Sequence, residues 1–225
     1  MALKVDRLAV GRLLRVNTSN VSDALDRLGI EGAAERVLPL WPGCQKIAGP
    51  VMTLKLVPKT EGMESAVMDT LRAAVAGGQG SILLISNGER DDLNSYGGIA
   101  ATTSRHHGVI GCVSDGAMRD VDEYKMLGFP CYARGIMQRS IRNFSSSAGY
   151  DCEAVFSGIA VKPGDYALAD DNGVVVIPRD RLDDVIAAAE TVKAVEEKVI
   201  ADVVAGKDPV RAHLDVDYDT MLRQR

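Results

Sequence analysis

The sequence over residues 96–135 alternates between apolar runs and glycine-containing turns, and this alternation restricts the fold more than any other feature. Two glycines precede a predicted helix over residues 99–107, and a predicted buried strand follows over residues 109–113. After a turn, a second predicted helix begins near Arg119. In alternating α/β proteins, ligands bind at the carboxyl ends of strands, where helix N-termini present free N–H groups. The junction between this strand and the second helix is therefore the first candidate site.

The rest of the chain carries further helices and strands in mixed order. Helices are predicted after Asn20, interpreted as an N-cap, over residues 63–75, and from Asp180, also interpreted as an N-cap, to about residue 205. Strands are predicted over residues 45–56, 81–86, 130–133 and 155–161, with a hairpin formed by residues 166–169 and 174–177. Residues 134–150 are expected to be irregular. Because several connections resemble hairpins, a mixed sheet or sandwich with outer helices is favoured over a strictly parallel fold, and we expect one domain over residues 1–225.

Charge and cysteine content argue against several classes of function. The 26 basic and 31 acidic residues leave a net charge of −5, whereas nucleic-acid and anionic-membrane binding need a cationic face. The cysteines are scattered, without C-x-x-C spacing or nearby histidines, which predicts buried structural thiols at Cys44, Cys112, Cys131 and Cys152. Charged residues interrupt the apolar N-terminus, and no apolar run approaches the roughly 20 residues of a membrane span. We therefore expect a cytoplasmic protein that binds neither nucleic acid nor membrane.

Glycine and histidine motifs elsewhere differ in what they indicate. The Gly77-Gly78-Gln79-Gly80 sequence follows a predicted helix and precedes a strand, which reverses the order of a dinucleotide-binding loop, so we expect a helix C-cap and turn there. His106 and His107 are adjacent, point in different directions on a helix and lack a third metal ligand at suitable spacing. By contrast, Gly97 and Gly98 ahead of an apolar helix expose consecutive N–H groups, which suits a carboxylate or phosphate.

Arg119, Asp120 and Glu123 are the strongest candidates for chemistry. If a helix begins near residue 119, the two carboxylates share one face, and a hard divalent cation such as Mg²⁺ or Mn²⁺ relieves their repulsion. Arg119 then offers a planar guanidinium that grips a substrate carboxylate in two places. The alternative is a solvated helix start, with acidic residues favoured by the helix dipole and the arginine in a salt bridge. Spacing alone does not separate these two interpretations.

The same residues resemble the signature of the family named for the regulator of ribonuclease activity A, which includes the class II 4-hydroxy-4-methyl-2-oxoglutarate/4-carboxy-4-hydroxy-2-oxoadipate aldolases. The signature is a glycine, twenty residues, Arg-Asp, two residues and an acidic residue, and it is matched here by Gly98, Arg119, Asp120 and Glu123. The surrounding sequence SDGAMRDVDEYKMLGFPCYARG is similar to the family's central block. A looser likeness extends from VSDALDRLG at residues 21–29 to VKPGDYALADDNGVVVIP at residues 161–178.

The resemblance implies an α/β fold: an αββαβ sandwich with a mixed central sheet, similar to a swivelling domain, and a long C-terminal helix that contacts a neighbouring subunit. It also implies a homotrimer or a dimer of trimers, with the active site between subunits. The backbone amides that would hold the pyruvyl group of the substrate are those of Gly97, Gly98, Ile99 and Ala100. Arg119 would bind the substrate, Asp120 would be the direct ligand to Mg²⁺ or Mn²⁺, and Glu123 completes the catalytic signature. A glutamate from the adjacent subunit would reach metal-bound water, and either Glu196 or Glu197 matches it.

The implied activity is that of a metal-dependent lyase, a class II pyruvate aldolase and/or oxaloacetate decarboxylase. Cleaving a 4-hydroxy-2-oxoacid and decarboxylating oxaloacetate both leave a pyruvate enolate, whose charge a divalent cation stabilises as a Lewis acid. The alternative is a non-catalytic regulator that binds a ribonuclease or helicase through an acidic surface. A third interpretation is a lyase or hydrolase of another substrate class that uses the same metal geometry.

Two segments depart from the family pattern. Gln79-Gly80-Ser81 stands where many members carry Pro-Gly-Asp, and residues 135–152 follow a different sequence altogether. In the latter segment, Arg139 and Arg142 offer positive charges for a second carboxylate of the substrate. The sequence leaves open the physiological substrate, the native metal and the choice between three and six chains.

Overall fold

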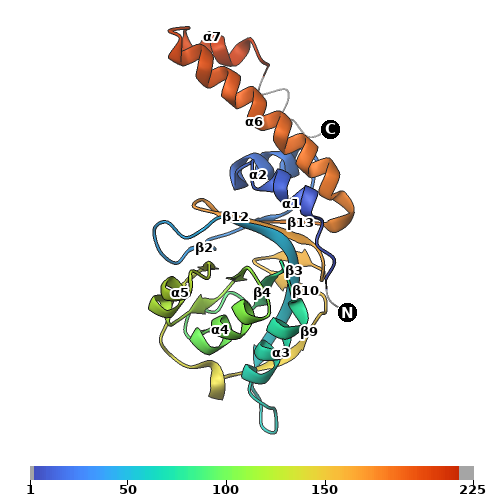
Figure 1. Cartoon of the computed structure of the whole chain (residues 1–225), viewed down its shortest axis with the longest axis vertical. Coiled ribbons are helices and arrows are strands. Elements are labelled where there is room, and N and C mark those ends of the chain that lie inside the picture. Colours follow the sequence, from blue (N-terminus) through green and yellow to red (C-terminus); the bar gives the residue numbers. More distant parts are fainter. Residues whose placement is uncertain (1–2, 218–225) are drawn as a thin grey trace.

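The computed structural model describes residues 3–217, which form a mixed β-sheet covered by two groups of helices (Figure 1). One group packs against the part of the sheet near its β13 end and consists of α1 (Arg7–Leu13), α2 (Thr18–Arg27) and α6 (Leu182–Val204). The other group covers the parallel part and consists of α3 (Val67–Gly77), α4 (Gly98–His106) and α5 (Val121–Leu127). A short helix, α7 (Pro209–Leu214), follows α6. The predicted α/β sandwich with a mixed sheet and a long C-terminal helix is confirmed.

The main sheet has the order β1-β13-β12-β3-β4-β5-β7-β2. Its strands are β1 (Ala33–Ala34), β2 (Leu38–Pro39), β3 (Ile47–Pro58), β4 (Ile82–Ser86), β5 (Gly111–Ser114), β7 (Cys131–Ala133), β12 (Tyr166–Asp170) and β13 (Gly173–Ile177). Strands β3, β4, β5 and β7 are parallel, and antiparallel pairs flank them. The long strand β3 pairs with β12 near its start and with β9 (Ser145–Tyr150) near its end.

Three clusters of buried apolar side chains hold the layers together, and β3 contributes to all of them. Met52 and Leu54 pack beneath α3, α4 and α5, whereas Ala48 packs beneath α1, α2 and α6. Ile47 and Val51 face a third cluster inside the curved sheet. Successive side chains of a strand point to opposite faces, so a strand covered on both faces is apolar at nearly every position. Burial on both faces therefore accounts for the mostly apolar sequence of β3, in which residues 47–54 are all buried.

The predicted start of the first helix at Asn20 is wrong. Helix α2 begins at Thr18 with Asn17 as its N-cap, and the Asn17 N–H donates to Asn20 Oδ1 at 3.1 Å. The two asparagines form a capping box, so Asn20 belongs to the N-terminal capping motif but occupies the third helical position. The C-terminal helix likewise begins at Leu182, after a 3-10 turn at Arg179–Arg181, because the predicted N-cap Asp180 lies within that turn.

Helix α3 begins at Val67, four residues beyond the predicted start, and the sequence analysis does not predict α1 or α7. The expected hairpin around Asp171-Asn172-Gly173 is confirmed by the pairing of β12 with β13. Gly78, with φ of 69°, is the C-cap of α3, as expected for the glycine-rich turn. The four cysteines are free, and all but the half-buried Cys152 are buried.

The prediction that residues 134–150 are irregular is wrong. Strand β8 (Gly135–Ile136) pairs with β6 (Ala117–Met118), a 3-10 turn η1 covers Ile141–Asn143, and β9 pairs with β3. The sequence of β9, SSSAGY, has weak strand propensity, so its regular structure depends on pairing with the distant β3.

The predicted single strand over residues 155–161 is instead a hairpin of β10 (Ala154–Phe156) and β11 (Ile159–Val161). Ser157 and Gly158 adopt positive φ angles of 48° and 81° and reverse the chain between the two strands. Among the described residues, no helix combines the length and the hydropathy that crossing a membrane requires.

Candidate active site

A cavity of about 330 Å³ lies where the loop before α4 meets the start of α5. Its walls come from residues 94–100, residues 119–123, one face of α3 and the η1 turn. The predicted site residues that line it are Gly97, Gly98, Ile99, Ala100, Arg119, Asp120 and Glu123. Segments that lie far apart in the sequence therefore converge on one cavity, whose volume suits a small molecule.

Asp120, one of the lining residues, holds an unusual backbone conformation. Its φ of 63° lies in the left-handed region, which costs a non-glycine residue energy but is best tolerated by Asp and Asn. Although Asp120 occupies the N-cap position of α5, its carboxylate does not cap that helix. Its Oδ2 instead accepts the Gly98 N–H at 2.9 Å. The strained backbone thus directs the carboxylate across the cavity towards the first turn of α4.

The two glycines at the start of α4 are needed because carboxylates occupy the space of their missing side chains. A Cβ at Gly97 would stand 2.7 Å from Asp120 Oδ2, and a Cβ at Gly98 would overlap the end of the Glu123 side chain. Neither glycine has a positive φ, so the requirement is one of space and not of backbone freedom. Gly98 and Glu123, which the signature separates by 24 residues, therefore pack directly against each other.

Arg119 lies beside Asp120, but the ion pair between them leaves N–H groups of the guanidinium without a partner among the described residues. The Arg119 Nε lies 3.4 Å from Asp120 Oδ2 but has no hydrogen-bond partner, and Nη1 donates to the Gln138 carbonyl at 3.3 Å. Both side chains are about one-third exposed, at 33% and 32%. Because a guanidinium has five donors, this arrangement leaves N–H groups to bind a carboxylate in the cavity.

Backbone amides add a second set of donors. The Gly98 N–H is taken by Asp120, and the Ala101 N–H donates to the Gly97 carbonyl. Within the part of the chain that the structure describes, no acceptor is found for the Ile99 and Ala100 N–H groups, which are the next two of the helix start. A helix N-terminus with free amides attracts carboxylates through its dipole and its hydrogen bonds.

The Tyr96 carbonyl joins the glycine loop to the start of α5. It accepts hydrogen bonds from the Arg119 N–H at 3.2 Å, the Tyr124 hydroxyl at 3.0 Å and Asn94 Nδ2 at 3.2 Å. Burial raises the pKa of the Tyr124 hydroxyl, so this hydroxyl remains a donor. Asn94 also accepts the Ile141 N–H at 2.9 Å, which ties η1 to the same loop. Asn94 and Tyr124 were not predicted as site residues, because Tyr124 reaches the Tyr96 carbonyl, and Asn94 the Ile141 N–H, only in the folded chain.

A divalent cation fits the donor set of this cavity. Asp120 and Glu123 present two carboxylates, and Mg²⁺ is commonly held by one or two carboxylates while water or substrate oxygens fill its remaining positions. Among the described residues, no group of three or more His, Cys, Asp or Glu side chains is arranged to hold a metal. A closed structural site of the zinc type is therefore not formed within the described residues, whereas an open site of the magnesium type is compatible with them.

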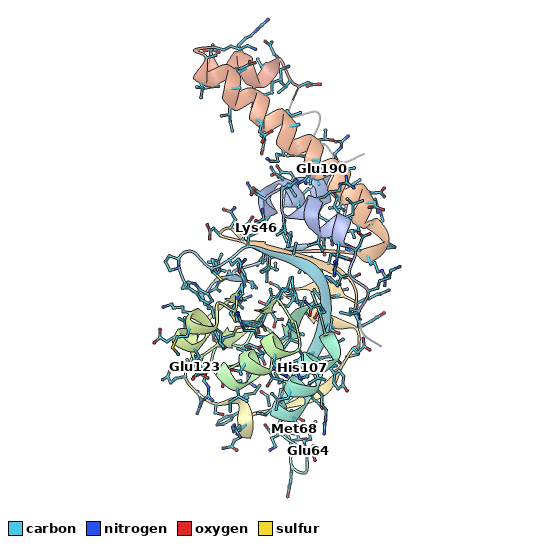
Figure 2. All side chains as sticks on the ribbon, in the orientation of Figure 1. Lys46, Glu64, Met68, His107, Glu123 and Glu190 are labelled. Atoms are coloured by element: carbon cyan, nitrogen blue, oxygen red, sulfur yellow. The ribbon has the colours of Figure 1, made fainter. Side chains whose placement is uncertain are left out.

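Glu196 and Glu197 lie outside the cavity of their own chain. Both are on α6: Glu196 accepts from Asn20 Nδ2 at 2.6 Å, and Glu197 pairs with Lys193 at 2.7 Å. Figure 2 shows Glu190, on the same helix, at the far side of the sheet from Glu123. A role for either glutamate at the cavity thus requires a neighbouring chain.

The comparison with known proteins accords with this arrangement. Residues 18–176 match the RraA-like family, which is described as Aldolase/RraA. The chain belongs to this family. The family match includes all seven of the predicted cavity residues that lie on the loop, on α4 and at the start of α5.

Individual relatives carry different names. A protein of Halalkalibacterium halodurans named "Putative 4-hydroxy-4-methyl-2-oxoglutarate aldolase" is 27% identical over 89% of this chain and 90% of its own length. Streptomyces coelicolor RraAS2, described as an unusual member of the RNase ES inhibitor RraA protein family, has a TM-score of 0.77 and 25% identity, covering 85% of this chain and 95% of its own. Protein DlpA of Legionella pneumophila is 31% identical over 92% of this chain, which spans only 34% of the length of that protein.

Proposed function

We propose that this chain is a divalent-metal-dependent lyase that cleaves a 4-hydroxy-2-oxoacid and releases pyruvate. The observation that carries the proposal is the convergence of Arg119, Asp120 and the free amides of the α4 start on one small cavity. The resemblance of the signature residues to the class II aldolases and the name of the Halalkalibacterium relative support the same reaction. The cavity volume supports a small substrate over a macromolecular one.

Each group has a role that follows from its position. The Ile99 and Ala100 N–H groups and the Arg119 guanidinium would bind the carboxylate and keto oxygens of the pyruvyl end. The Asp120 carboxylate, oriented by the Gly98 N–H, would hold Mg²⁺ or Mn²⁺. When bound, such a cation supplies Lewis-acid stabilisation of the negative charge that develops on the keto oxygen.

The bond changes of the reaction balance without an oxidant or reductant. The 4-hydroxyl group loses its proton, its oxygen forms a double bond to C4 as the C3–C4 bond breaks, and the electron pair of the C3–C4 bond passes into the enolate of pyruvate. The enolate then takes a proton at C3, and the C4 fragment leaves as a carbonyl compound. The Glu123 carboxylate would accept the hydroxyl proton, since no hydrogen bond or ion pair engages it within the described residues. Decarboxylation of oxaloacetate passes through the same enolate, so we propose it as a second activity of this site.

The proposal is tested by pyruvate release from 4-hydroxy-2-oxoacids and oxaloacetate, with Mg²⁺ or Mn²⁺ and with a chelator. We expect activity that the chelator abolishes and that added metal restores. Asp120→Asn keeps a residue that tolerates the left-handed backbone, so we expect a loss of about 100-fold or more in kcat with the fold retained. Titration calorimetry with Mn²⁺ should show weaker metal binding by this variant. Unchanged rates in Asp120→Asn and Arg119→Lys would refute the assigned roles.

We also propose that the protein is a homo-oligomer in which α6 contacts a neighbouring chain. Ile200 and Val204 on the outer half of α6 are 62% and 82% exposed, and this half extends beyond the sheet (Figure 1). Light scattering should give the mass of three or six chains, and the double variant Ile200→Asp/Val204→Asp should lower it. Val155→Asp, at another exposed apolar position, is the matched control, and a monomeric unmodified protein would contradict the proposal.

The regulator hypothesis remains the second candidate, and the likeness to Streptomyces coelicolor RraAS2, a member of an RNase ES inhibitor family, favours it. A regulator binds its partner without turnover. Stoichiometric capture of a purified ribonuclease or helicase, combined with no metal-dependent pyruvate release from any 2-oxoacid, would make regulation the better explanation.

A further inference from the structure

The η1 turn places one of two neighbouring arginines in the cavity. Arg142 lines the cavity, whereas Arg139 is not among the lining residues and stacks on the Phe144 ring, with its guanidinium carbon 4.6 Å from the ring centroid. No hydrogen bond or ion pair to the Arg142 guanidinium is found among residues 3–217. The sequence alone does not distinguish the two arginines, whereas in the structure Arg142 lines the cavity and Arg139 does not.

The backbone that carries Arg142 is held in place from several sides. The Ile141 N–H donates to Asn94 Oδ1, and the Asn94 N–H donates to the Arg139 carbonyl at 2.8 Å. The Ser140 hydroxyl accepts the Arg142 N–H at 3.3 Å, which caps the 3-10 turn. Because Asn94 also bonds to the Tyr96 carbonyl, the turn is fixed relative to the glycine loop. The backbone segment that carries Arg142 is therefore anchored at the cavity.

The charges of the cavity favour a substrate with two anionic groups. The lining residues include two arginines, Arg119 and Arg142, and two carboxylates, Asp120 and Glu123, so their charges cancel. A divalent cation held there would leave an excess of two positive charges. A substrate with one carboxylate would neutralise one of them, and a dicarboxylate would neutralise both.

We propose that Arg142 is a specificity-determining residue that binds a second carboxylate at the end of the substrate remote from the pyruvyl group. This inference rests on the proposed lyase function and assigns a residue of the η1 turn to the distal end of the substrate. Arg119 and the amides of the α4 start serve the pyruvyl end, and the remaining charged lining residue, on the η1 turn, is Arg142. The other wall near it, formed by Val67, Thr70 and Leu71 of α3, carries no charge.

The test compares two substrates that differ only at the distal group: 4-hydroxy-2-oxoglutarate, with a carboxylate, and 4-hydroxy-2-oxopentanoate, with a methyl group. We expect the unmodified protein to prefer the dicarboxylate in kcat/KM, and Arg142→Gln to reduce this preference about 10- to 100-fold, chiefly through KM. Arg139→Gln removes the same charge from the same segment and should keep the preference within about twofold. An equal fall with both substrates, or an equal effect of both variants, would overturn the inference.

Binding without turnover separates this inference from the proposed reaction. Titration calorimetry with 2-oxoglutarate and with 2-oxopentanoate, in the presence of Mn²⁺, should show tighter binding of the dicarboxylate, and Arg142→Gln should abolish the difference. If the protein releases no pyruvate but keeps this Arg142-dependent preference, the lyase proposal fails and the assignment of Arg142 stands. If the unmodified protein binds both acids equally, the assignment of Arg142 fails whatever the activity.

Discussion

At the scale of single residues, the cavity depends on two carboxylates that occupy the space left by the absent β-carbons of Gly97 and Gly98. Gly98 exists as glycine because the Glu123 carboxylate occupies the position of a β-carbon. Asp120 gives up a favourable N-cap hydrogen bond for a contact with the neighbouring helix. In both cases the residue departs from its local conformational preference, and the geometry of the site benefits. Such conflicts are most common where a protein does its chemistry.

Gly98→Ala should separate function from stability. The added methyl group meets the flexible end of Glu123, which can swing aside, and alanine is a better helix former than glycine. We expect pyruvate release to fall about tenfold or more while the free energy of unfolding changes by less than about 1 kcal/mol. Activity assays and urea denaturation of the same preparations measure the two effects.

Gly11→Ala is the matched control, because Gly11 is also helical and has nothing within 4 Å of its missing β-carbon. It should stabilise α1 by up to about 1 kcal/mol and leave activity unchanged. Full activity of Gly98→Ala would mean that the position of Glu123 is unimportant for turnover.

The sequence predicts some of these residues and misses others for a physical reason. Arg119, Asp120 and Glu123 are close together in the chain, so their chemistry can be read from spacing. The contacts of Tyr124 with the Tyr96 carbonyl and of Asn94 with the Ile141 N–H join distant parts of the chain, so only the tertiary structure shows them. The roles given to the signature residues stay predictions until they are tested by substitution.

At the scale of elements, η1 is the part of the site that is hardest to predict from the sequence. In the folded chain, hydrogen bonds to Asn94 and Ser140 hold it in place. It follows a segment without clear periodicity, and its position depends on the buried side chain of Asn94. Strand β4, a short apolar run, and helix α4, between the glycine loop and the strand that follows, were predicted within one residue of their true bounds. The serine-rich β9 was missed because its pairing with β3 compensates for poor local propensity.

Asn94→Ala should loosen η1 selectively. The substitution leaves the buried Ile141 N–H without its acceptor and removes a donor to the Tyr96 carbonyl, so we expect a loss of about 1–3 kcal/mol in unfolding free energy. Amide hydrogen exchange across residues 139–144 should accelerate more than exchange in β4. This measurement distinguishes a local effect on the turn from general destabilisation.

Asn143→Ala tests the same turn at an exposed position. We expect it to change the unfolding free energy by no more than about 0.5 kcal/mol. If both variants exchanged alike, Asn94 would not be the anchor of η1.

At the scale of the whole molecule, a paired charge connects the first helix with the last long one. Arg12 of α1 binds Glu190 of α6 through two hydrogen bonds of 2.8 and 2.6 Å. The hydrogen bond from Arg12 lowers the pKa of the Glu190 carboxyl below its ordinary value of 4.5. A carboxyl whose pKa is lower in the folded chain stabilises the fold above the ordinary pKa, and this contribution is lost as the pH falls through the folded value.

Glu190→Gln should therefore lower stability at pH 7 by less than about 1 kcal/mol, since both side chains are partly exposed. The difference from the unmodified protein should shrink as the pH falls below 4.5. Urea denaturation between pH 3 and pH 7 measures the loss of stability and its dependence on pH. Glu197→Gln, which breaks a pair within α6 itself, should have an effect of only about 0.5 kcal/mol or less. A difference that grew towards acid pH would contradict the assigned direction.

Strand β3 has a further consequence for how the molecule responds to stress. Its side chains belong to all three apolar clusters, so the helices around the cavity and the helices of the α6 group share one common support. Heat or denaturant that detaches either group exposes β3 and removes the foundation of the other. Calorimetric and spectroscopic melting curves should coincide, and no partly melted form should keep the cavity intact after the α6 side has come away.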